Sequence, residues 1–148
     1  MSKSSEAAAV TGTKVVTPRL VIALLLFVAG IAWIAYYYSS VRPDPMSGAA
    51  GSPKAIADLG LWNYTIGFGL AMLGLVVSAH PSTPLGRGRG VVVGMLGCFL
   101  VGLLWICTYY VFAEDLSKIW VFNDLGAWNL VVGIALMGVG FSYATKWE

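Results

Sequence analysis

Four stretches of 19 to 22 residues contain no Asp, Glu, Lys, Arg or His. They cover residues 20–38, 59–79, 91–112 and 125–144. An α-helix rises about 1.5 Å per residue, so each stretch reaches about 30 Å, which is the thickness of the hydrocarbon core of a bilayer. Because that core offers no water to unpaired backbone groups, we expect an all-α integral membrane protein with four transmembrane helices.

The composition excludes most other classes of protein. Only 11% of the 148 residues are charged and 58% are hydrophobic, whereas a soluble domain carries about 25% charged residues. An ordinary globular enzyme, a disordered chain and a disulfide-stapled secreted domain are therefore excluded. The net charge of +2 is too small to indicate nucleic-acid binding. Cys98 and Cys107 are nine positions apart, on opposite faces of a helix, so they cannot form a disulfide and are expected to pack.

The basic residues outside the four stretches predict how the chain is oriented. Six lie on one side of a four-span topology and three on the other. The six are Lys3, Lys14, Arg19, Arg87, Arg89 and Lys146, and the three are Arg42, Lys54 and Lys118. We therefore expect a multi-pass plasma-membrane protein with both termini in the cytoplasm. The first stretch is long for a signal peptide and ends in tyrosines, so it is expected to remain as an anchor.

The chain resembles itself at two offsets. Val28-Ala-Gly-Ile-Ala-Trp33 matches Leu100-Val-Gly-Leu-Leu-Trp105 at an offset of 72. Asp58-Leu-Gly-Leu-Trp-Asn63 matches Asp124-Leu-Gly-Ala-Trp-Asn129 at an offset of 66. This pattern predicts a duplicated two-helix hairpin. The two copies should be parallel and related by a two-fold axis along the membrane normal, as a pseudo-dimer within one chain.

The same pattern divides the chain into four segments. Residues 1–19 are predicted to form a disordered cytoplasmic tail, residues 20–79 the first hairpin, residues 80–90 a cytoplasmic linker and residues 91–148 the second hairpin. Leu116, Ile119 and Trp120 have helical spacing, which predicts a segment lying along the membrane surface. Tyr143 and Trp147 are expected in the aromatic belt at the opposite boundary.

Trp62-Asn63 and Trp128-Asn129 recur at the same depth, near one end of their helices. The simplest interpretation is that the aspartate four positions before each tryptophan caps the helix, and that the tryptophans lie in the aromatic belt. An amide that faces lipid is costly. We therefore expect both asparagines to face the interior and to hold either the hairpin or the two copies together.

Small residues recur along the same two helices. Gly67 and Gly74 of the second stretch align with Gly133 and Gly140 of the fourth at the offset of 66. Such spacing lets helix backbones approach closely. We therefore assign these glycines to helix packing or partner contact, together with the two Trp-Asn pairs.

No acidic or basic residue lies inside any of the four stretches, so an ion pump or a proton relay would lack its usual machinery. His80 is the only histidine and has no second ligand or base nearby in the sequence. We therefore expect no enzyme, no cofactor and no metal site. A small transporter or channel remains the alternative, with a polar path along Asn63, Thr65, Thr108 and Asn129.

These motifs resemble CrgA, a family of small actinobacterial cell-division membrane proteins. The residues that carry the resemblance are Gly30 to Trp33 with Leu59-Gly-Leu-Trp-Asn-Tyr64, Gly102 to Trp105 with Leu125-Gly-Ala-Trp-Asn129, and the terminal Lys146-Trp147. The resemblance implies a non-catalytic septal scaffold of the divisome, which coordinates septum formation with peptidoglycan synthesis through lateral transmembrane contacts. It implies FtsQ, septal penicillin-binding proteins and FtsZ as partners, besides membrane lipid. This chain departs from the family in having two hairpins and a weakly basic tail.

Overall fold

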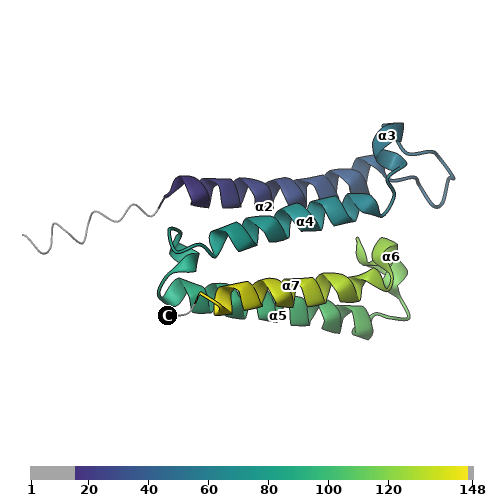
Figure 1. The fold of residues 1–148 in the computed structure, drawn as a ribbon. Helices are drawn as coiled ribbons and strands as arrows, with labels where there is room; N and C mark the ends of the chain where they lie inside the picture. The colour runs from purple at the N-terminus through teal and green to yellow at the C-terminus, as the bar shows by residue number, and fades with distance from the viewer. Residues whose placement is uncertain (1–15, 147–148) are drawn as a thin grey trace, which may run out of the picture.

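The computed structural model of the protein describes residues 16–146. Every regular element in this part of the chain is helical (Figure 1). The elements are α2 (Pro18–Tyr36), a π-helical turn (Tyr37–Val41), α3 (Lys54–Ala57), α4 (Trp62–Ser78), a 3₁₀ turn (Pro84–Gly86), α5 (Arg89–Val111), a 3₁₀ turn (Leu116–Lys118), α6 (Phe122–Leu125) and α7 (Trp128–Ala144). Most of the predicted tail, and Trp147, lie outside the described residues.

The helices begin where local chemistry allows. At α2, the Thr17 hydroxyl accepts a hydrogen bond from the Leu20 amide at 3.2 Å, and Pro18 occupies the first helical position, where its missing N–H costs nothing. α4 and α7 begin three residues later than predicted. The residues before them form a turn in which Gly60 and Gly126 adopt φ values of 52° and 51°, a conformation that favours glycine.

The loops differ from the sequence-based predictions in two respects. Asp58 and Asp124 do not cap α4 and α7, because the capping positions are Leu61 and Ala127 and neither makes a side-chain capping bond. The spacing of Leu116, Ile119 and Trp120 also does not correspond to one helix, since only Leu116–Lys118 form a 3₁₀ turn and the next residue is extended. The position of this segment along the membrane surface stays a prediction. Side-chain spacing alone did not reveal that the chain bends there.

Figure 1 shows two antiparallel hairpins lying side by side, α2 with α4 and α5 with α7. The α4 and α7 helices are neighbours and run in the same direction. We call the end that carries α3 and α6 the loop end. The opposite end, where residues 79–88 join the hairpins and α7 finishes, is the linker end. Both described chain ends lie there.

Glycines set the close approach within each hairpin. A Cβ atom on Gly30 would lie 2.5 Å from the amide nitrogen of Ala71, and would also strike the Gly67 carbonyl. In the second hairpin, a Cβ on Gly102 would lie 2.7 Å from the carbonyl oxygen of Gly133. No side chain fits at such distances, so these positions require glycine and fix the register of each pair.

Within residues 16–146, two helices are long and apolar enough to cross a membrane, α2 with the turn that follows it (Pro18–Val41) and α5. The apolar helices α4 and α7 contain 17 residues each, which corresponds to about 26 Å. Each is therefore at the short limit for a span.

Candidate interface between and beside the hairpins

Asn63 and Asn129 fasten the turn that precedes their helix. Both side chains are completely buried. The Asn63 amide nitrogen donates to the carbonyl oxygens of Ile56 and Gly60 at 2.8 and 3.0 Å. The Asn129 amide makes the same two bonds, to the residues seven and three positions earlier, at 3.0 and 2.8 Å. Each of these carbonyls also accepts a backbone N–H. The bonds stay within one hairpin, so each asparagine adds a second donor to carbonyls of the turn before its own helix.

Gly67, Gly74, Gly133 and Gly140 all face the other helix of their own hairpin. A Cβ on Gly74 would lie 2.6 Å from the carbonyl oxygen of Ala23, and one on Gly140 would lie 3.2 Å from that of Met95. All four are buried. Because their surfaces are covered by α2 or α5, an external partner cannot reach them unless a hairpin opens.

Trp62 and Trp128 point outward instead. Their exposed fractions are 68% and 59%, and both line an apolar groove of about 530 Å³ between α4 and α7. Each helix contributes matching positions to the groove. They are Trp62, Thr65 and Gly69 on α4, and Trp128, Val131 and Ala135 on α7. From Leu61 to Met72 the groove follows α4 for about three turns, or about 16 Å.

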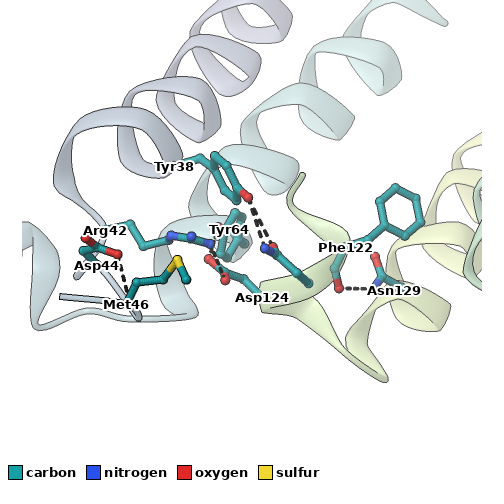
Figure 2. A network of polar contacts seen from close by, with 9 residues as sticks. Tyr38, Arg42, Asp44, Met46, Tyr64, Phe122, Asp124 and Asn129 are labelled. Atoms are coloured by element: carbon teal, nitrogen blue, oxygen red, sulfur yellow. Dashed lines mark hydrogen bonds and ion pairs between the residues drawn. The ribbon is translucent and has the colours of Figure 1, made fainter. Parts of the chain in front are cut away.

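At the loop end, a cluster of polar side chains that we call the clasp joins the two hairpins (Figure 2). The Arg42 guanidinium donates to Oδ1 of Asp124 at 2.6 Å, and the Tyr64 hydroxyl donates to Oδ2 at 2.6 Å. The Arg42 and Asp124 side chains are only 19% and 24% exposed, and Tyr64 is buried. One carboxylate of the second hairpin thus binds two donors of the first.

Aromatic contacts extend the clasp. The Arg42 guanidinium carbon lies 4.3 Å from the centre of the Tyr38 ring, a cation–π distance. The Tyr38 ring stacks on Trp120 with centroids 5.9 Å apart, and its hydroxyl accepts from the Asn123 amide at 3.1 Å. The Trp120 segment therefore lies against the first hairpin.

Tyr143 closes the gap between the hairpins at the linker end. Its side chain is fully buried, and its hydroxyl donates to the carbonyl oxygen of Leu75 at 2.8 Å and bonds to the Ser78 hydroxyl. Gly94 leaves room for its ring, since a Cβ there would lie 2.5 Å from Cδ1. The expectation that Tyr143 lies in an aromatic belt is wrong, because α7 directs the ring toward α4.

The polar residues proposed for a transport path do not converge. The Asn63 and Asn129 amides are bonded to their own turns, and the Thr108 hydroxyl donates to the Leu104 carbonyl of its own helix at 2.7 Å. Thr65 lines a groove whose other walls are apolar. The geometry therefore does not favour the transporter or channel.

His80 lies at the linker end beside cations. Its Nε2 accepts from the Arg19 guanidinium, and its Nδ1 lies 2.9 Å from the Ser82 hydroxyl. The Ser82 backbone N–H also donates to Nδ1 at 3.1 Å. Partial removal from water and the charges of Arg19 and Lys146 lower the pKa of His80 below its usual value.

Of the two thiols, Cys98 is buried and Cys107 exposed, and neither is in a disulfide.

Together, these features define a small protein whose described residues form only helical elements and two hairpins joined at both ends. Two of these helices are long and apolar enough to cross a membrane. The family model for the cell division protein CrgA matches residues 1–80 and residues 84–148. The chain belongs to the CrgA family of cell division proteins.

Two relatives show the same similarity. A cell division protein CrgA from Streptomyces avermitilis is 38% identical over 64 residues, which cover 43% of this chain and 71% of the relative. One from Bifidobacterium longum is 38% identical over 49 residues, or 33% of this chain and 45% of the relative. No solved structure matches the chain.

Proposed function

We propose that this protein is a multi-pass membrane scaffold of cell division that binds other division proteins laterally, without catalysis. Membership of a cell-division family supports the cellular process. The four apolar helices make up most of the described residues, so their surfaces offer most of the area for recognition. FtsQ-like proteins and septal penicillin-binding proteins are the proposed partners within the septal membrane, and FtsZ is the proposed cytoplasmic one.

The proposed topology has four spans with both termini in the cytoplasm. At 17 residues, α4 and α7 are just long enough to cross, and the turns that Asn63 and Asn129 fasten would lie at the boundary. The described chain ends share the linker end, which also carries Arg19, Arg87, Arg89 and Lys146. An excess of basic residues on that side favours a cytoplasmic location.

We also propose that the chain is a fusion of two family units. Two ranges of the chain match the family model. The Asn63 and Asn129 turns have the same two bonds, and the Gly30 and Gly102 crossings meet the equivalent glycine of the next helix. In that case one chain with two hairpins takes the place of a homodimer, and the hairpins pack without the entropy cost of bringing two separate chains together.

The groove between α4 and α7 carries the proposal for partner binding. The proposed occupant is an apolar transmembrane helix of another division protein. The groove continues the interface between the hairpins, its walls are apolar, and it leaves two tryptophans largely exposed. Tryptophans are frequent anchors of protein interfaces. A length of about three turns suits a helix that crosses α4 and α7 at an angle.

Site-specific photo-crosslinking in cells tests this function. A photoreactive phenylalanine replaces Val131, which lines the groove, or Val93, which is exposed on α5 at 62% and does not line it. We expect the probe at position 131 to join the transmembrane segment of a division protein, identified by mass spectrometry, at several times the yield from position 93. Equal yields, or adducts with unrelated membrane proteins alone, would refute the proposed surface. Reporter fusions after each helix test the four crossings separately.

A further inference from the structure

A hollow of about 570 Å³ opens at the linker end. Three separate segments form it: the linker, the first turn of α5 and the end of α7. The basic side chains that line it are Arg87, Arg89 and Lys146. Residues distant in the sequence thus bring three cations to one concave surface.

The electrostatics around the hollow favour an anion. The described residues make two salt bridges, Arg42 with Asp124 and Lys118 with Asp115, both of them at the loop end. The three cations of the hollow therefore have no carboxylate partner among residues 16–146. Arg19 also lies at this end, with its guanidinium against His80, so a fourth cation adds to the positive potential there.

The backbone of the hollow leaves room for a ligand. Gly88 adopts a φ of 53°, and a Cβ there would meet nothing within 4 Å. α5 begins at Arg89, and its first turn contains no acidic residue. The hollow therefore lies at the positive end of the α5 helix dipole, which adds to the positive potential of the side chains.

We propose that this hollow binds a phosphate-bearing anion, either the headgroup of an anionic membrane lipid or free phosphate. Charge complementarity carries the assignment, because three guanidinium or ammonium groups face a hollow that has no carboxylate wall among the described residues. The lipid source rests on the proposed membrane function, in which the ends of α5 and α7 lie at the cytoplasmic headgroup level. Binding of free phosphate does not depend on where α5 and α7 lie in the membrane.

The test is a binding titration of the full-length protein, purified in a maltoside detergent and followed by native mass spectrometry. The ligands are dioleoylphosphatidylglycerol, dioleoylphosphatidylcholine with the same acyl chains, and inorganic phosphate. The variant Arg89→Gln/Lys146→Gln removes two cations of the hollow, and the matched control Lys54→Gln/Lys118→Gln removes two cations of the loop end. All four side chains are exposed, so the fold should be kept, which circular dichroism verifies.

We expect phosphatidylglycerol to bind more tightly than phosphatidylcholine. Each removed cation should weaken binding about fivefold, so the hollow variant should lose about 25-fold and the control should be unchanged. Competition by inorganic phosphate would assign the site to free phosphate, and its absence would assign it to the lipid. Equal losses in both variants, or equal affinity for the two lipids without phosphate binding, would overturn the proposal. Partner crosslinking from Val131 is measured independently, so either proposal can fail alone.

Discussion

Asp124 should be the residue whose loss separates the two hairpins most directly. Its carboxylate accepts from both Arg42 and Tyr64 at 2.6 Å. Hydrogen bonds to a charged group contribute about 1.5–3 kcal/mol each. The Arg42 bond is partly exposed, at 19% and 24% for the two side chains, so solvent reduces its contribution. We expect Asp124→Ala to lower the free energy of unfolding by about 3 kcal/mol.

The chain supplies its own control for this experiment. Asp58 is the equivalent position of the first hairpin, it is exposed, and within the described residues its carboxylate makes no salt bridge or hydrogen bond. Asp58→Ala should therefore change the free energy of unfolding by less than about 0.5 kcal/mol. Titration of the detergent-solubilised protein with dodecyl sulfate, followed by circular dichroism, measures both variants.

A double-mutant cycle identifies the partner. Arg42→Gln combined with Asp124→Ala should show a coupling energy of about 1 kcal/mol or more, whereas Arg42→Gln combined with Asp58→Ala should be additive. If Asp124→Ala and Asp58→Ala unfold at the same detergent fraction, the clasp does not hold the hairpins together and the reasoning fails.

Three more perturbations test other parts of the structure. Gly67→Leu should lower the free energy of unfolding by about 3 kcal/mol through overpacking. Gly69→Leu is the control, because a Cβ there would meet nothing within 4 Å, and it should leave the dodecyl sulfate midpoint unchanged. Equal midpoints for the two variants would contradict the helix register. Asn129→Leu removes two side-chain hydrogen bonds to the Phe122 and Gly126 carbonyls and should lower the free energy of unfolding by about 2 kcal/mol in the same titration. Wild-type stability would refute this role. Because the folded-state pKa of His80 is lowered, stability should be constant above about pH 6.5 and fall below it as the unfolded chain takes up the proton. Thermal melts at pH 7.5 and pH 5.0 should differ in the wild type and less in His80→Gln. An equal difference in the two proteins would contradict the lowered pKa of His80.

Much of the fold follows from local chemistry. A stretch without charges that is long enough to cross a bilayer can satisfy its backbone only as a helix, which is why the positions of α2, α4, α5 and α7 could be predicted to within a few residues. The glycine spacing likewise indicated close helix packing. The starts of α4 and α7 were missed by three residues, because Gly60 and Gly126 each form a turn whose carbonyl accepts a hydrogen bond from the asparagine side chain.

The roles of the aspartates could not be predicted in the same way. Asp58 and Asp124 occupy equivalent places in matching motifs, and nothing local distinguishes them. Only Asp124 meets an arginine and a tyrosine, because Arg42 and Tyr64 come from the other hairpin. In the second half, the corresponding positions hold Glu114 and Leu130, which cannot donate to a carboxylate.

The sequence by itself determined the contacts inside each hairpin, because they use positions that the two halves share: the glycines of the crossings and the asparagines of the turns. Only the tertiary structure decided the contacts between the hairpins, which use positions where the halves differ, such as Tyr143, whose counterpart is Val77. The physical reason is distance along the chain. Backbone hydrogen bonding and close helix packing depend on neighbours a few turns away, whereas a bond over 60 or more residues exists only after the hairpins have packed.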